Sequence, residues 1–202
     1  NPIIEKVDFD ISAQGYALCV VDTGGNHADL TDEYAAIPAE MKRVAGYFGK
    51  QFLRDVDEKE FYEQIGEIRK QTGDRAVLRA MHFFDDDRLA AEEAEALRAG
   101  DFAGFQEMVL ASGRSSLQRL QNVFAVVNPQ EQGLTLALAL TEKLLAGKGA
   151  WRVHGGGFAG TIQAYVPFSM LDEYRAAIEK VFGEGACYTL SVRQPGGTKV
   201  EF

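Results

Sequence analysis

Near residue 150 the spacing of apolar residues changes from a helical period to a strand period. Before that point, apolar residues in several segments recur at i, i+3, i+4 and i+7, as they do from Met41 to Phe48, and this period is typical of amphipathic helices. After that point, residues 161–166 alternate strictly between apolar and more polar side chains, as in a strand with one buried face. Helices and strands that are separated along the sequence indicate an α+β fold with a mainly antiparallel sheet and a set of packed helices.

The sequence predicts one early strand, then a run of helices, and then four strands with one helix among them. The strands are expected at residues 16–21, 150–153, 161–166, 186–192 and 198–202. The helices are expected at residues 38–48, 58–70, 75–84, 88–99, 102–110, 115–124, 129–145 and 171–182. Neither a linker nor an internal repeat divides the sequence, so we expect residues 1–202 to form one domain.

Several of these helix ends are predicted from residues with known preferences. Pro38 suits the first turn of a helix, and Asn128 followed by Pro129 suits an N-cap and the first helical position. Asp101 is expected to cap the helix that follows it, and Gly113 to interrupt one. The run Asp85–Asp87 is interpreted as a helix start, where the helix dipole favours carboxylates.

The charge of the chain limits the partners it can bind. The 202 residues include 21 Lys and Arg and 30 Asp and Glu, which gives a net charge of −9. Nucleic acids and anionic membranes attract basic surfaces, so we expect neither as a partner. A nucleotide is not excluded, because a few local donors are enough to bind one.

The two cysteines and the lack of long apolar segments suggest the cellular compartment. Cys19 and Cys187 are too few for a disulfide scaffold or a structural zinc site, and both lie in apolar runs, so we interpret them as buried hydrophobic residues. No stretch has the ~20 consecutive apolar residues that a membrane helix needs. We therefore expect a cytoplasmic protein.

A glycine-rich segment, Gly155 to Gly160, matches the pattern G-x-G-x-x-G. In a dinucleotide-binding fold this pattern opens a helix, whose N-terminus meets the pyrophosphate. Here a predicted strand follows, so we reject that interpretation. Two others remain open: a tight turn between strands, or a backbone that lies directly against a ligand or a phosphate-binding element.

A second segment, residues 22–34, is dense in hydrogen-bonding side chains, including His27, Asp32 and Tyr34. Such a loop could bind the hydroxyl groups of a sugar, or it could be a solvated loop with helix caps. The three histidines form no HExxH pair and there is no G-x-S-x-G elbow, so we find no catalytic pair or metal ligands. His82, on an apolar helix, is expected to be a core residue.

Together the two segments resemble a known family. The sequence VDTGGNHADLTDEY at residues 21–34 resembles the middle of a galactokinase, and RVHGGGFAG at residues 152–160 resembles the third motif of the GHMP kinase superfamily. The resemblance covers essentially the whole chain but only the C-terminal half of a galactokinase. It departs from the usual motif at His154 and Ala159; alanine at position 159 requires a negative φ or some strain.

The resemblance implies a fold and a function. The fold would be that of a GHMP kinase C-terminal domain, with a ferredoxin-like strand–helix–strand–strand portion at its C-terminal end. The complete enzyme would phosphorylate galactose at C1 with ATP and Mg, and its catalytic residues would lie in an N-terminal domain outside this chain. This half would contribute the substrate-binding residues Tyr34, Asp32 and His27, and a nucleotide-cleft segment formed by Gly155, Gly156, Gly157, Phe158 and Gly160. No metal ligand is expected in it, and the chain alone would be inactive.

Two alternatives to a galactokinase remain open. Some galactokinase-like proteins sense sugars without catalysis, and sibling kinases of the superfamily phosphorylate other small molecules. The sequence preceding this chain would distinguish a kinase from a sensor, because an intact phosphate-binding loop and catalytic base favour a kinase.

Overall fold

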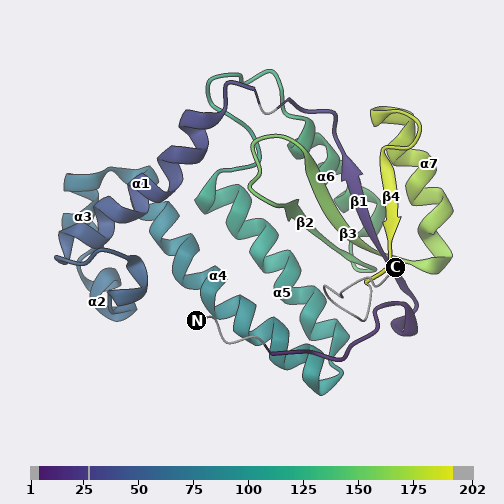
Figure 1. The fold of residues 1–202 in the computed structure, drawn as a ribbon, viewed down its shortest axis with the longest axis horizontal. Helices are drawn as coiled ribbons and strands as arrows, with labels where there is room; N and C mark the ends of the chain where they lie inside the picture. The colour runs from purple at the N-terminus through teal and green to yellow at the C-terminus, as the bar shows by residue number, and fades with distance from the viewer. Residues whose placement is uncertain (1–4, 27, 193–202) are drawn as a thin grey trace, which may run out of the picture.

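A computed structural model describes residues 5–26 and 28–192 of the chain. Its four strands are β1 (Tyr16–Asp22), β2 (Ala150–His154), β3 (Thr161–Pro167) and β4 (Cys187–Leu190). They form one antiparallel sheet in the order β2-β3-β1-β4 (Figure 1). The α+β prediction is confirmed, and four of the expected strands are present. The expected strand at 198–202 lies outside the described residues.

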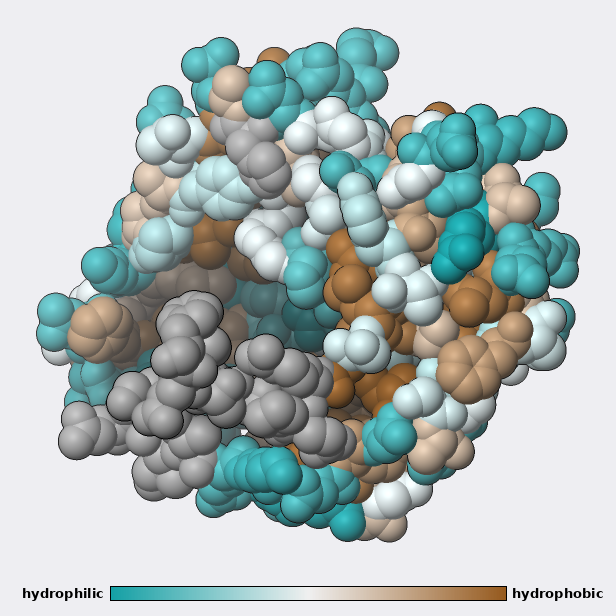
Figure 2. All heavy atoms as spheres, turned by 45° about the vertical axis from the view of Figure 1, so that its right-hand side comes forward, coloured by the Kyte–Doolittle hydropathy of each residue, from teal (hydrophilic) through white to brown (hydrophobic). Residues whose placement is uncertain are grey.

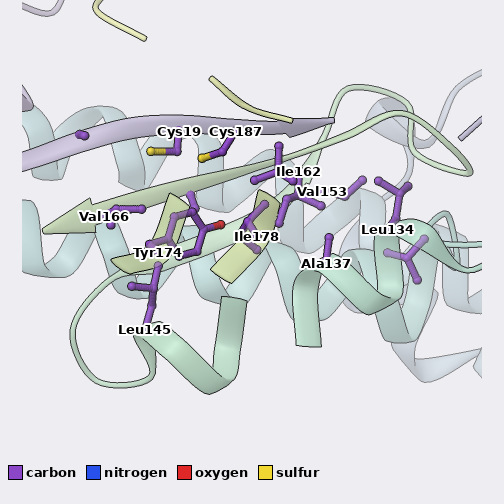
Figure 3. Close-up of a cluster of buried hydrophobic side chains, with 14 residues drawn as sticks. Cys19, Leu134, Ala137, Leu145, Val153, Ile162, Val166, Tyr174, Ile178 and Cys187 are labelled. Carbon is purple, nitrogen blue, oxygen red and sulfur yellow. The ribbon is translucent and has the colours of Figure 1, made fainter. Parts of the chain in front are cut away.

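One face of the sheet is covered by α6 (Gly133–Leu145) and α7 (Leu171–Phe182). Alternate residues of β1 and β3 point toward these helices, and they pack with Leu134, Tyr174 and Ile178 in a buried apolar cluster. Cys19 and Cys187 lie side by side in this cluster (Figure 3). Both thiols are buried and form no disulfide, which agrees with their interpretation as core residues.

The opposite face is covered by the long helix α5 (Phe102–Ser115), and a second long helix, α4 (Asp74–Ala99), packs beside α5 (Figure 1). Phe102, Phe105 and Val109 of α5 pack on Tyr165 of β3. The expected cap of α5 is confirmed, since the Asp101 carboxylate accepts a hydrogen bond of 2.9 Å from the Gly104 amide.

A separate helical lobe extends from the N-terminal half of α4. It consists of α1 (Thr31–Tyr47), α2 (Glu58–Glu63) and α3 (Ile65–Thr72), and it has its own apolar core around Phe61 and Ile68 (Figure 1). The remaining short elements are the 3-10 turns Ser12–Gln14, Leu53–Asp55 and Phe168–Met170 and the π turn Ser116–Leu120.

The side of the molecule that carries β4 and α7 exposes apolar atoms among polar ones (Figure 2). The large apolar residues exposed there are Phe168, Val181, Tyr188, Leu190 and Val192.

The prediction that Asp85–Asp87 starts a helix is wrong. The expected helices at 75–84 and 88–99 are one continuous helix, α4, and the three carboxylates lie in its middle. Each carboxylate has a partner there. Asp85 pairs with Arg88 and Arg119, Asp86 accepts a hydrogen bond from Ser112, and Asp87 pairs with Arg54. Contacts with residues distant in sequence, rather than a helix dipole, therefore explain why three carboxylates stand together here.

Other predicted helix boundaries are also wrong. Pro38 lies inside α1, which begins at Thr31, so the helix lacks one internal hydrogen bond there. The helix expected after Asn128 begins at Gly133, because the preceding residues form turns closed by bonds such as Asn128 N–H to Ala125 O. The helix expected at 115–124 ends at Leu120, and the helix expected at 58–70 is divided at Gln64.

Gly113 does not interrupt a helix but lets one pack closely on the sheet. It lies within α5, where an added Cβ would be 3.0 Å from the Trp151 carbonyl oxygen and 3.2 Å from Arg152 Cβ. A glycine at this position therefore lets the axis of α5 approach the backbone of β2.

We expect Gly113→Val to lower the free energy of unfolding by about 1–3 kcal/mol, because the side chain would overlap β2. The matched control is Gly46→Val in α1, where an added Cβ meets nothing within 4 Å and the change should stay within about 0.5 kcal/mol. Chemical denaturation measures both. Equal effects at the two positions would contradict this account of the packing.

Candidate functional site

The glycine segment forms a tight turn between β2 and β3. Gly155, Gly157, Phe158 and Gly160 have φ angles of 72°, 81°, 59° and 92°, which lie in or near the left-handed region that glycine tolerates best. A strand follows the turn, so the rejection of a dinucleotide-binding site is upheld. Phe158 rather than Ala159 has the positive φ, so the departure at Ala159 is accommodated as expected.

Asn122 holds one side of this turn. Its side-chain Nδ2 donates a 3.0 Å hydrogen bond to the Gly156 carbonyl, and its own carbonyl accepts one from the Phe158 amide. A Cβ at Gly157 would overlap the Asn122 carbonyl oxygen and lie 2.6 Å from Nδ2. Asn122 is 2% exposed, so its contact with the turn is buried.

Tyr34 holds the other side. Its hydroxyl donates a 2.7 Å hydrogen bond to the Gly157 carbonyl. Its ring lies against Gly156, where an added Cβ would be 2.9 Å from Tyr34 Cε1. The ring also packs edge to face on the Phe158 ring, with 5.1 Å between the ring centroids. Burial raises the pKa of Tyr34 above its ordinary value, so the phenol keeps the proton that it donates.

The loop that follows β1 holds the end of the turn. The amide and the hydroxyl of Thr23 donate hydrogen bonds of 3.0 and 2.7 Å to the Gly160 carbonyl. Gly25 lies against Ala159, because a Cβ at Gly25 would be only 3.1 Å from the alanine Cβ. Residues from two segments far apart in the sequence, Thr23 to Tyr34 and Asn122, therefore fix the backbone of one six-residue turn.

A cavity of about 950 Å³ lies next to the turn. Its walls are the loop after β1, the segment that leads into α6, and Phe158 and Ala159 of the turn. Leu30 and Ala125 pack with these two residues in a small apolar cluster that also contacts Tyr34. Amide and carboxylate side chains, among them Asn128 and Glu131, also line the cavity, so it offers both polar and apolar groups.

The structure brings together Tyr34 and Gly155–Gly160 of the predicted site residues. Asp32 lies in the first turn of α1 and is exposed, and among the described residues it forms no hydrogen bond to the glycine turn. His27 lies outside the described residues. His82 is buried, and its Nδ1 is 2.9 Å from the Ser115 hydroxyl, which agrees with its interpretation as a core residue.

The sequence reasoning missed Asn122. It lies in a segment that was expected to be helical, and the only local signal was the polar pair Gln121–Asn122 among apolar residues. Asparagine often bonds to backbone groups outside helices, but its contact with a turn 34 residues away depends on the tertiary fold.

In residues 5–26 and 28–192, no three His, Cys, Asp or Glu side chains are grouped so that they could hold a metal ion. No helix in this described part of the chain combines the length and apolar character required to cross a membrane.

Comparison with known proteins supports the resemblance to galactokinases. No family model matches the chain. The galactokinases of Glaesserella parasuis and Streptomyces coelicolor are both 28% identical to it, over 180 and 179 residues, and that of Actinobacillus pleuropneumoniae is 27% identical over 164 residues. These matches cover 87%, 88% and 81% of this chain but only 45%, 43% and 41% of the relatives.

The fold of the chain is also similar to that of a solved galactokinase. Lactococcus lactis galactokinase, solved in complex with galactose, superposes with a TM-score of 0.66 at 23% identity, over 88% of this chain and 45% of that one. The chain is thus similar in sequence and fold to about half of a sugar kinase. Its resemblance to the C-terminal half of galactokinases is confirmed.

We expect Gly157→Ala to destabilise the chain by more than about 2 kcal/mol, because the methyl group combines an unfavourable φ with overlap of the Asn122 backbone. Gly155→Ala is the matched control. Its φ is also positive but its Cβ would meet nothing within 4 Å, so we expect about 1 kcal/mol from backbone strain alone. Denaturant unfolding compares the two, and equal losses would show that Asn122 does not confine the turn.

Proposed function

We propose that residues 1–202 form the C-terminal domain of a galactokinase and supply one wall of its substrate cleft. The observation that carries this proposal is the direct contact between Tyr34 and the glycine turn. The resemblance to galactokinases implies that Tyr34 binds the sugar and that the glycine turn belongs to the nucleotide cleft. A hydrogen bond of 2.7 Å between them would let one surface serve both substrates.

On the sugar side, Tyr34 and Asp32 would bind galactose. A phenol that donates its hydrogen can still accept a hydrogen bond at its oxygen, so Tyr34 could accept one from a sugar hydroxyl while it holds the Gly157 carbonyl. Asp32 lies in the first turn of the same helix with its side chain exposed, and a carboxylate readily accepts hydrogen bonds from hydroxyl groups. We also propose that His27, which lies outside the described residues, binds galactose.

On the nucleotide side, the turn Gly155–Gly160 would support the phosphate-binding loop of the other domain. In the reaction, the γ-phosphoryl group of ATP moves to the C1 oxygen of galactose, ADP leaves, and the hydroxyl proton is released. Such transfers depend mainly on positioning and electrostatic stabilisation. A backbone held from three sides provides a fixed surface for positioning, while ATP, Mg and the catalytic residues would be held chiefly by the other domain.

We expect the purified 202-residue chain to show no galactose-dependent ATP turnover, because the base and the phosphate-binding loop would lie outside it. A longer form that includes the N-terminal domain should produce galactose 1-phosphate and ADP under the same conditions. A coupled ADP assay measures both. Turnover by the short chain well above the blank would refute the division of labour, and an inactive long form that still binds galactose would favour a sugar sensor.

In the longer form, we expect Tyr34→Phe to raise the galactose KM about 3–10-fold, as for the loss of one hydrogen bond, and to raise the ATP KM less. Tyr47→Phe is the matched control, since this tyrosine lies on the same helix and its hydroxyl bonds to Gln64 in the helical lobe. Steady-state kinetics with each substrate varied gives the galactose KM and the ATP KM of the wild type and of both variants. Equal increases in both KM values would reject the sugar contact.

A further inference from the structure

A buried arginine links the helical lobe to the glycine turn. Arg79 of α4 is 1% exposed and is among the largest fully buried side chains in the described residues. Its Nη1 donates a 2.8 Å hydrogen bond to Glu40 Oε2 on α1, and its Nε donates one of 3.2 Å to the Leu120 carbonyl. One guanidinium thus joins α1, α4 and the end of the π turn.

Glu40 is held in this position by more than one cation. Its Oε1 is 2.6 Å from Arg75 Nη2, and Arg43 lies within 3.6 Å. Burial alone would raise the pKa of Glu40, but the hydrogen bond from Arg75 and the charge of Arg79 outweigh it and lower the pKa. The carboxylate therefore stays ionised and keeps its bond to Arg79.

The Leu120 carbonyl lies two residues before Asn122. Between them Gln121 has a left-handed conformation, with φ 58° and ψ 48°, and its amide donates to the Ser116 carbonyl at 2.8 Å. This reversal turns the chain out of the π turn so that Asn122 reaches Gly156 and Phe158. A shift of the Leu120 carbonyl would therefore move the residue that holds the glycine turn.

Stability alone does not account for these buried charges. Replacing a buried ion pair with apolar residues of similar volume is often neutral or stabilising, because desolvation of the charges offsets their attraction. The bond from Nε to Leu120 is also not required for pairing with Glu40. A planar guanidinium, however, can hold a carboxylate and a carbonyl in a fixed relative position, as it does here.

We propose that Glu40 and Arg79 are positioning residues that set the location of Asn122 and, through it, the conformation of the glycine turn. The same helix α1 then acts on the turn by two routes, through Tyr34 directly and through Glu40 and Arg79 by way of Asn122. The effect on catalysis rests on the proposed function, but the effect on the turn does not.

Amide hydrogen exchange on the 202-residue chain, without substrate, tests this proposal. The Phe158 amide reports on the bond to Asn122, and the Thr23 amide, bonded to Gly160, reports on the other side of the turn. The free energy of unfolding is measured in parallel. Because no substrate is present, the result does not depend on whether the chain is part of a galactokinase.

The decisive variant is the double substitution Glu40→Leu with Arg79→Met, which removes both buried charges. We expect its stability to be close to that of the wild type or higher, while the Phe158 amide exchanges at least ~10-fold faster through local opening and the Thr23 amide is unchanged. Wild-type exchange at Phe158 in a stable double variant would overturn the proposal, because the pair would then act only on stability.

Arg79→Lys provides a second test if the double variant does not fold. It keeps the charge, but a single ammonium group cannot reproduce the planar fork that spans Glu40 and Leu120. We expect faster exchange at Phe158 by about 10-fold with a folded, stable chain. Exchange within twofold of the wild type would overturn the proposal. Arg69→Met, which breaks an exposed pair with Asp74, is the control and should change neither amide.

Discussion

Hydrogen bonds from outside the turn between β2 and β3 stabilise its left-handed backbone, at three carbonyls and one amide. Tyr34 holds the Gly157 carbonyl, Asn122 holds Gly156 and Phe158, and Thr23 holds Gly160. Because residue 157 is a glycine, Asn122 can lie close enough to bond to the turn, where a Cβ would overlap the Asn122 carbonyl oxygen. The candidate site is therefore a backbone structure fixed by Thr23, Tyr34 and Asn122, rather than a group of reactive side chains.

The rest of the fold brings those segments together. The antiparallel register of β1 and β3 pairs Asp22 with Thr161. The loop after β1 and the glycine turn before β3 therefore lie at the same end of these two strands. Helices α6 and α7 cover one face of the sheet, and the start of α6 packs against the loop after β1, since a Cβ at Gly133 would be 3.2 Å from Thr23 Cβ. The helical lobe contributes α1, which carries Tyr34 to the turn.

The sequence predicted the strands better than the helix boundaries, for a physical reason. Alternation in residues 161–166 reflects one buried face and is a local property, so β3 was found within one residue. The sequence favours a helix start at Asp85–Asp87, and it could not show the actual partners of these carboxylates, because Arg54, Ser112 and Arg119 are distant in sequence. Asn122 could not be predicted for the same reason. The glycine segment and the loop with Tyr34 stand out in the sequence itself, the resemblance implies their roles, and the structure shows that they are in contact.

The most direct test of this account is a crystal structure of a longer form of the protein, with its N-terminal domain, bound to galactose and an ATP analogue. The account predicts that a galactose oxygen lies within hydrogen-bond distance of the Tyr34 hydroxyl, below about 3.2 Å, and that the turn keeps the conformation described here beside the phosphate-binding loop. Galactose bound at a place that neither Tyr34 nor the turn borders would contradict it.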